Sequence, residues 1–199
     1  MRVRVSTSNH VPKPHTPFQW ARQETAAELQ PKHALLRDRC RSAGVEFTWN
    51  DPEDSFLEAV LSRGDRRVAE AVYAAWRRGA KFDAWGEYFN PQAWRDAFAE
   101  TGVDPDWFAH REWDTREPLP WDHVDCGVTK SYLRGQWQDV LSGRTVGDCH
   151  HGSCNVCGMQ KFDALGESKG VADCVVKLDR LVELRRGARK YEGEMVELV

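Results

Sequence analysis

Helix-capping signals between residues 51 and 143 restrict the fold more than any other feature of this sequence. The segment 51–64, DPEDSFLEAVLSRG, places Asp51 at the N-cap, Pro52 at the first helical position and Gly64 just past the end. Three further segments have helical patterns: 65–80, 90–102 and 129–143. The sequence therefore predicts an array of short helices.

Each of these helices is expected to bury one apolar face, because apolar residues recur at helical spacing. The residues predicted to be buried are Val68, Val72, Trp76, Trp94, Phe98, Leu133, Trp137 and Leu141. A segment rich in Pro, Asp and Trp, 103–127, separates the last two helices and is expected to be a loop. A final helix is predicted at about 171–186.

Two strand patterns precede the helical array. The segments RVRVS (2–6) and VEFTW (45–49) are rich in β-branched and aromatic residues, which is typical of strands. A helix at about 23–43 lies between them, so the order is that of a βαβ unit. The expected fold is α+β and mostly α-helical.

For the predicted helix at 23–43, the sequence indicates which residues are buried and where the helix bends or begins. Leu29, Leu36 and Cys40 occur at near-helical spacing and are expected to be buried, Cys40 as a small core residue. Pro31 should kink this helix or mark its true start.

Composition and charge exclude several classes of protein. The 199-residue chain has a net charge of −3, which does not favour a nucleic-acid partner. No segment approaches the roughly 18 apolar residues of a membrane span. The first 20 residues lack the apolar core of a signal peptide, so we expect a cytoplasmic protein with reduced thiols. The nine tryptophans are expected to be packing residues.

Three cysteines are concentrated in one short segment near the C-terminus. Cys149, Cys154 and Cys157 have C-x4-C-x2-C spacing, and their thiolates are natural ligands of zinc and of iron–sulfur clusters. A fourth ligand is needed, and Cys174 is the first choice. Cys126 is the second candidate, and the third is His150 or His151. Zinc and iron–sulfur remain equally open, and free structural thiols are the alternative.

Two loops contain groups that could act on a ligand. His10, Lys13 and His15 follow the end of the first strand, where α/β proteins bind ligands, although a stiff surface turn explains them better. Asp122 and His123 could form an acid–base pair, but a loop cap is the preferred interpretation.

Four segments of the chain resemble the B12-binding radical SAM proteins of unknown substrate. VSTSNHVPKPHTPFQW (5–20) is similar to the last-strand segment of their barrel, and DCHHGSCNVCG (148–158) to their C-terminal cysteine motif. The long segment 51–90 and EPLPWDHVDCGVTKSYL (117–133) are similar to the region after the barrel. The resemblance covers nearly the whole chain.

This resemblance implies the C-terminal portion of an enzyme that cleaves S-adenosylmethionine reductively with a [4Fe–4S] cluster. The expected parts are the last βα portion of a partial TIM-type barrel (1–50), a helical region (51–145) and a cysteine-cluster segment with the C-terminal helix (146–199). The C-x3-C-x2-C triplet that binds the radical-generating cluster is absent from the sequence, as is a cobalamin domain. The chain is therefore expected to be catalytically incomplete by itself.

The resemblance also implies roles for particular residues and partners. The segment that would line the cofactor pocket consists of Pro12, Lys13, Pro14, His15 and Thr16. The metal site formed by Cys149, Cys154, Cys157 and Cys174 would be auxiliary, which favours iron–sulfur slightly. S-adenosylmethionine and cobalamin would bind only in a full-length enzyme, or in one complemented by a separate chain that carries the missing barrel. The alternative is a zinc-stabilised, non-enzymatic helical module that binds a protein partner.

Overall fold

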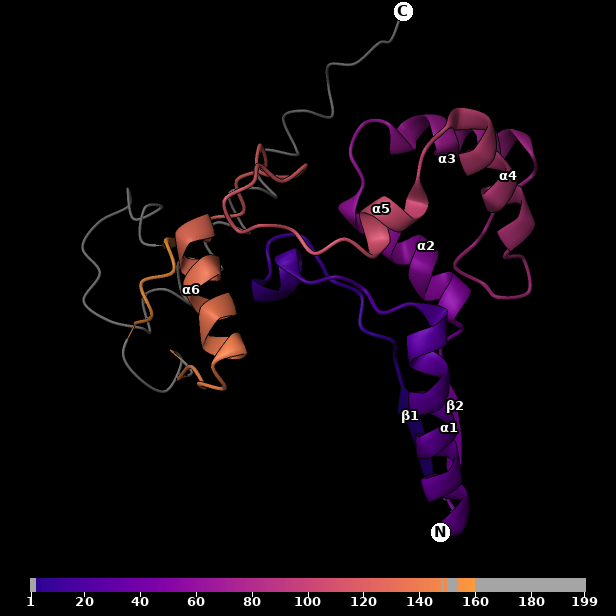
Figure 1. Cartoon of the computed structure of the whole chain (residues 1–199), viewed down its shortest axis with the longest axis horizontal. Coiled ribbons are helices and arrows are strands. Elements are labelled where there is room, and N and C mark those ends of the chain that lie inside the picture. Colours follow the sequence, from indigo (N-terminus) through magenta and orange to yellow (C-terminus); the bar gives the residue numbers. More distant parts are fainter. Residues whose placement is uncertain (1–2, 148, 150–153, 160–199) are drawn as a thin grey trace, which may run out of the picture. The chain divides into compact units, whose positions relative to one another are not determined.

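The computed structural model describes residues 3–147, 149 and 154–159, which form parts of two compact units (Figure 1). The first unit spans residues 1–124 and the second residues 125–199. The predicted helix at 171–186 and the proposed ligands Cys174, His150 and His151 lie outside the described residues.

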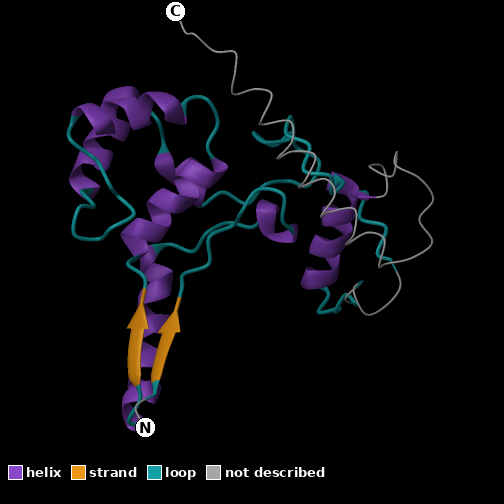
Figure 2. Cartoon of the chain, turned by 180° about the vertical axis from the view of Figure 1, so that it is seen from behind, coloured by secondary structure: helices purple, strands orange, loops and turns teal. Residues whose placement is uncertain are grey.

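A βαβ unit opens the first unit, as predicted. Strand β1 (Arg4–Thr7) pairs in parallel with β2 (Glu46–Trp49), and Arg4 is aligned with Glu46. Helix α1 (Ala26–Ser42) connects the strands and lies against one face of the pair (Figure 2). We call these three elements the βαβ arm.

Helix α1 begins at a capping box. The Thr25 hydroxyl accepts a hydrogen bond from the backbone N–H of Glu28, and the Glu28 carboxylate accepts one from the backbone N–H of Thr25. This arrangement satisfies two N–H groups that a helix start otherwise leaves without partners. The helix therefore starts at Ala26, before Pro31, and the prediction that Pro31 could mark its start is wrong.

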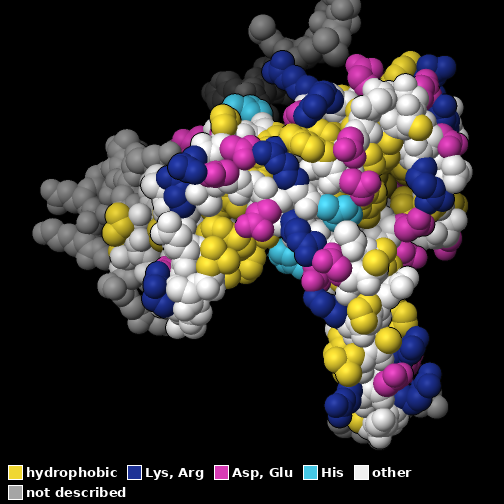
Figure 3. All heavy atoms as spheres, viewed as in Figure 1, with side chains coloured by type: hydrophobic (Ala, Val, Ile, Leu, Met, Phe, Trp, Pro, Cys, Tyr) yellow, Lys and Arg dark blue, Asp and Glu magenta, His cyan; other side chains and the backbone are white. Residues whose placement is uncertain are grey.

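The βαβ arm buries fewer apolar side chains than its sequence predicts. Leu29 is buried, but Leu36 is 39% exposed and Cys40 is only half-buried, so the burial predicted for Leu36 and Cys40 is wrong. Val5 of β1 and Trp49 of β2 are also 39% exposed, and apolar side chains lie on the surface of the arm in Figure 3. Trp49 lies on the face of the strand pair that α1 covers, with its ring centroid 5.4 Å from that of His33, so a single helix leaves even this face partly exposed.

The helical core of the first unit consists of α2 (Pro52–Arg63), α3 (Val68–Arg77), α4 (Pro91–Thr101) and α5 (Pro105–Ala109). The Asp51 side chain accepts a hydrogen bond from the backbone of Glu53, as predicted, and the Asn90 side chain accepts one from that of Ala93. Helix α3, in contrast, begins at Val68 without a side-chain cap. Helix α5 lies within the segment 103–127 that was expected to be a loop. At five residues it is too short for a periodic pattern to predict.

The buried face of α3 consists mainly of alanines. Ala71, Ala74 and Ala75 are at most 5% exposed, whereas Val72 is 42% and Trp76 is 56% exposed. The burial predicted for Val72 and Trp76 is therefore wrong, while that predicted for Val68, Trp94 and Phe98 is confirmed. Helix α3 packs along α4, which also presents alanines, and small side chains let two helix backbones approach closely.

The tryptophans do not share one role. Trp20, Trp94, Trp113 and Trp121 are buried as predicted. The exposed ones are Trp49, Trp76, Trp85 and Trp107, so packing within the described chain does not explain them all. No helix among the described residues is long and apolar enough to cross a membrane.

Arg63 ties the end of α2 to the segment after α5. Its side chain is completely buried, and its Nη1 and Nη2 donate to the carbonyl oxygens of Ala109 and Arg111, each at 2.6 Å. Burial, together with the neighbouring Arg111 charge, lowers the pKa of Arg63 to about 10. The guanidinium thus acts as a bridge between backbone carbonyls rather than as a partner of a carboxylate.

The second unit contains α6 (Lys130–Leu141), which Thr129 caps by accepting a hydrogen bond from the backbone of Tyr132. Leu133 is buried as predicted, but Trp137 is half-buried and Leu141 is 67% exposed. The burial predicted for Leu141 is wrong. The final helical turn, where Leu141 lies, has no described neighbour to cover it.

Candidate functional site

The segment Cys154–Gly158 forms a tight turn around one sulfur atom. The backbone N–H of Val156 donates a hydrogen bond to Cys154 Sγ at 3.4 Å. Val156 has a φ of 52° and Gly158 a φ of 112°, both in the left-handed region, which is unfavourable for a β-branched residue such as Val156. This contact orients the Cys154 side chain, and cysteine sulfur binds metals as the thiolate.

Backbone contacts hold this turn against the start of α6. The backbone N–H and the hydroxyl of Thr129 both donate to the carbonyl oxygen of Cys157, at 2.8 and 3.2 Å. A Cβ at Gly158 would lie 2.5 Å from Thr129 Cγ2 and 2.9 Å from the Gly127 carbonyl oxygen, so only glycine fits. Cys157 therefore lies beside the segment that directly follows Cys126.

Tyr132, in the first turn of α6, lies near all three cysteines of the C-x4-C-x2-C segment. Burial raises the pKa of Tyr132, a hydrogen bond with Asn155 opposes this, and the charges of Cys157, Cys149 and Cys154 add to the rise. Asn155 also donates to the carbonyl oxygen of Gly147 at 2.8 Å. The structure thus brings the three predicted thiols to the same end of α6.

These thiols do not converge on a single point. In the described part of the chain, no group of three or more His, Cys, Asp or Glu side chains is close enough together to hold a metal ion. Cys149 and Cys157 are half-buried, and Cys154 and Cys126 are exposed. The donor chemistry fits a thiolate metal site, but binding a metal here requires movement of the cysteine side chains.

The proline-rich loop is fixed by contacts within the first unit. Pro12 is fully buried, and Lys13 Nζ donates to the Glu58 carboxylate and, at 3.1 Å, to Ser62 Oγ, both on α2. Thr16 Oγ1 donates to the carbonyl oxygen of Lys13 at 2.8 Å. The loop is therefore stiff, and its lysine charge is already paired.

His15 and Pro14 complete the predicted cofactor-binding segment, and both are half-buried. His15 has a φ of 58°, and its backbone N–H donates to Gln19 Oε1 at 3.2 Å. The same Gln19 oxygen accepts from the indole nitrogen of Trp121 at 2.7 Å. The segment thus follows β1 in a conformation that buried polar contacts maintain.

Asp122 acts as a loop cap, as the sequence favoured. Its carboxylate accepts a hydrogen bond from the backbone N–H of Leu119 at 2.8 Å, and its own N–H donates to the Leu119 carbonyl at 3.0 Å. Asp122 and the neighbouring His123 are exposed. The loop cap expected at this position is therefore present at Asp122.

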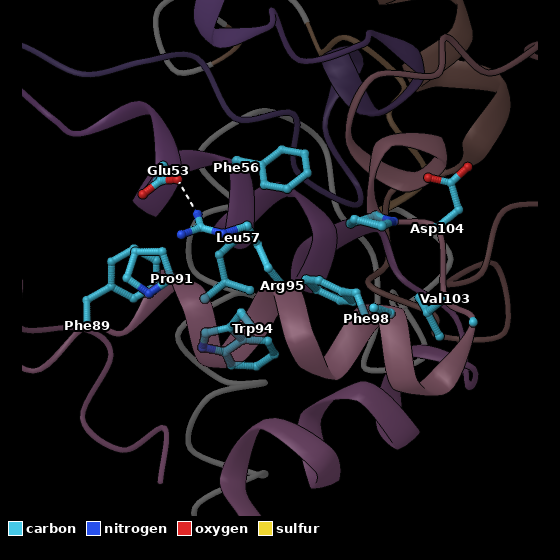
Figure 4. A pocket seen from close by; sticks show the side chains of 13 residues that line it. Glu53, Phe56, Leu57, Phe89, Pro91, Trp94, Arg95, Phe98, Val103 and Asp104 are labelled. Carbon is cyan, nitrogen blue, oxygen red and sulfur yellow. Dashed lines mark hydrogen bonds and ion pairs between the residues drawn. The ribbon is translucent and has the colours of Figure 1, made fainter. Parts of the chain in front are cut away.

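A cavity of about 500 Å³ lies between α2 and α4 and was not predicted (Figure 4). The side chains that form its walls are mostly aromatic or aliphatic: Phe56, Leu57, Phe89, Trp94, Phe98 and Val103. Sequence periodicity marks some of these residues as core, but it cannot indicate that two helices leave a space between them.

No protein-family model matches the chain, and no curated protein or solved structure matches it either. The residues and geometry of this chain, together with the resemblance of the quoted segments, are therefore the only basis for a function.

Proposed function

We propose that this chain is the C-terminal portion, or a complementing subunit, of a B12-type radical SAM enzyme and is catalytically incomplete by itself. The observation that carries the proposal is the open parallel pair β1–β2. Parallel strands occur almost only in sheets with both faces covered, and an isolated pair of strands is marginally stable. The pair is therefore best explained as part of a larger parallel sheet, such as the end of a TIM-type barrel.

The carboxyl ends of both strands support this assignment. Asn9, just after β1, donates to the carbonyl oxygen of Asn50, just after β2, and to Ser55 Oγ on α2, both at 3.0 Å. The Asn9 carboxamide oxygen also contacts His33 Nε2 at 2.8 Å. TIM barrels bind their ligands at this end of the strands. In a complete barrel, Pro12 through Thr16 would therefore face the ligand side.

The radical chemistry would come from the missing part of the enzyme. The [4Fe–4S] cluster, S-adenosylmethionine and cobalamin supply reductive cleavage and group transfer there, and this sequence has no C-x3-C-x2-C triplet to bind that cluster. The residues of this chain would contribute the last strands, the rigid loop at the barrel mouth and the helical core that supports them.

The auxiliary metal site is the part of the function proposed for this chain alone. Cys149, Cys154 and Cys157 would supply three thiolates to zinc or to an iron–sulfur cluster. The fourth ligand would be Cys174 or Cys126, with His150 or His151 as the third candidate. The contacts of Thr129 with Cys157 support Cys126, because they hold the segment after Cys126 against the cysteine turn.

Metal analysis of protein purified without oxygen tests this site. We expect stoichiometric zinc, or iron with broad absorption near the violet end of the visible spectrum, and loss of the metal in Cys154→Ser. Cys40→Ser is the matched control, since Cys40 lies in the other unit and should leave the metal content unchanged. Comparison of Cys126→Ser with Cys174→Ser identifies the fourth ligand. Absence of stoichiometric metal in the wild-type chain would contradict the site.

Association with a barrel chain tests the larger proposal. The chain should co-purify with a separately expressed polypeptide that carries a C-x3-C-x2-C barrel and a cobalamin domain, and the pair should cleave S-adenosylmethionine. Val5→Asp on β1 should abolish the association, whereas Leu61→Asp, at a similarly exposed position on α2, should not. Equal association of both variants, or none of the wild-type chain, would contradict the proposal.

The alternative is a zinc-stabilised helical module that binds a protein partner without catalysis. The observation that favours it is the helical core, which buries its own cluster of apolar residues without the arm. Stoichiometric zinc in a chain that fails to associate with any barrel polypeptide would support this second function.

A further inference from the structure

The cavity of about 500 Å³ lies where two pairs of helices meet. Helix α3 packs along α4, and α2 packs along α5. The cavity walls come from α2, from α4 and from the connection 102–105 that leads into α5. A molecule bound there would contact both pairs of helices and hold them together.

The walls of the cavity are apolar and rich in aromatic rings. Phe56 and Leu57 project from α2, and Trp94 and Phe98 from α4, where the two rings lie 5.9 Å apart between centroids (Figure 4). Phe89 closes the end of the cavity near the start of α4. Apolar walls of this kind gain free energy from contact with an apolar ligand, above all one with a flat ring.

The charged groups at the cavity rim are already paired with other parts of the protein. Arg95 Nη1 donates to Glu53 Oε1 at 2.5 Å, and Arg95 Nε donates to Gln92 Oε1 at 3.1 Å. Asp104 accepts hydrogen bonds from the backbone N–H groups of Asp106 and Trp107. A charged ligand would have to displace these partners, so the rim favours an uncharged one.

We propose that this cavity binds an uncharged, largely apolar small molecule that contains an aromatic ring. The volume lies within the range of about 300–1,000 Å³ that is typical of small-molecule sites. None of the residues that line the cavity belongs to the cysteine segment or to the proline-rich loop. It does not depend on the function proposed above.

Titration with N-phenyl-1-naphthylamine, an uncharged aromatic dye that fluoresces in apolar surroundings, tests the proposal. We expect saturable binding of one dye per chain and a melting temperature that rises with dye concentration. Ala99→Trp places an indole in the cavity wall and should weaken binding by about tenfold or more. Ala69→Trp, at an exposed position on α3 outside the cavity, is the matched control and should bind like the wild type.

The charge preference is tested with the sulfonated dye 8-anilinonaphthalene-1-sulfonate. The wild-type chain should bind it more weakly than the uncharged dye, and Glu53→Gln, which frees Arg95, should reduce this difference. Lack of saturable binding of the uncharged dye, or equal binding by Ala99→Trp and Ala69→Trp, would overturn the proposed site. Tighter binding of the sulfonate by the wild-type chain would overturn the preference for an uncharged ligand.

Discussion

The helical core and the βαβ arm belong to the same unit but differ in how much apolar surface they bury. In the core, Val60, Ala71 and Ala97 are completely buried, because short helices pack on one another from several directions. In the arm, α1 covers one face of the strand pair, and Val5 and Trp49 remain substantially exposed. The strand and helix patterns in the sequence are therefore sufficient to form the arm, but they do not ensure that its apolar side chains are buried.

Phe98→Ala should be the most destabilising substitution. The Phe98 side chain is 5% exposed and packs against Trp94, so truncation should cost about 3–4 kcal/mol of unfolding free energy. Urea denaturation followed by circular dichroism measures this loss. Phe47→Ala, at a half-buried position in β2, is the matched variant and should cost about 1 kcal/mol or less. Equal losses would show that the arm is as well packed as the core.

Arg63→Ala should be the next most destabilising substitution. It removes the completely buried guanidinium that donates to the carbonyl oxygens of Ala109 and Arg111, of which the Ala109 oxygen keeps the backbone N–H of Gln23, and this should cost about 2–3 kcal/mol. Chemical denaturation measures the change. Arg66→Ala, at an exposed position just after α2, is the control and should lie within about 0.5 kcal/mol of the wild type. A small loss in Arg63→Ala would mean that the bridge is not needed to hold the core.

Asn9→Ala tests the junction between the two regions. It removes the hydrogen bonds to Asn50 and Ser55, so we expect a loss of about 1–2 kcal/mol and faster amide exchange in the arm than in the core. Hydrogen-exchange mass spectrometry resolves the two regions. Ser8→Ala, at the exposed neighbouring position, should change neither. Uniform acceleration across both regions would show that arm and core unfold together.

Glu28→Gln should have the smallest effect and a distinctive pH dependence. The hydrogen bonds from Arg22, and then those from Thr25, hold the pKa of Glu28 well below its usual range. The Glu28 carboxylate therefore takes up a proton more readily in the unfolded chain than in the folded protein. The resulting stabilisation is present above the ordinary glutamate pKa of about 4.3 and is lost as the pH falls further.

Melting temperatures of the wild type and of Glu28→Gln at several pH values test this expectation. The difference in melting temperature between the wild type and Glu28→Gln should be largest near neutral pH and should decrease below about pH 4. Glu70→Gln, at an exposed position on α3 of the core, is the control for the general loss of one carboxylate. A difference in melting temperature between wild type and Glu28→Gln that does not change with pH would contradict a stabilising role of the Glu28 carboxylate charge.

Only part of the cysteine site could be predicted from the sequence. The spacing of Cys149, Cys154 and Cys157 indicated their shared location, and the structure places all three near Tyr132. The contacts of Thr129 with Cys157 could not be predicted, because they join residues 28 positions apart and end on a backbone carbonyl that every residue has. The proximity of the segment after Cys126 to the turn follows from these contacts alone.

Local structure could be predicted from the amino-acid sequence: the capped starts of α2 and α4 and the βαβ order of the arm. The caps depend on interactions between residues a few positions apart, and the order follows from the strand and helix patterns. Contacts between distant residues, in contrast, determine that alanines rather than Val72 and Trp76 face α4, and that a cavity separates α2 from α4. The physical reason is that burial depends on how closely whole helices approach, and this distance is set by side chains from both partners together.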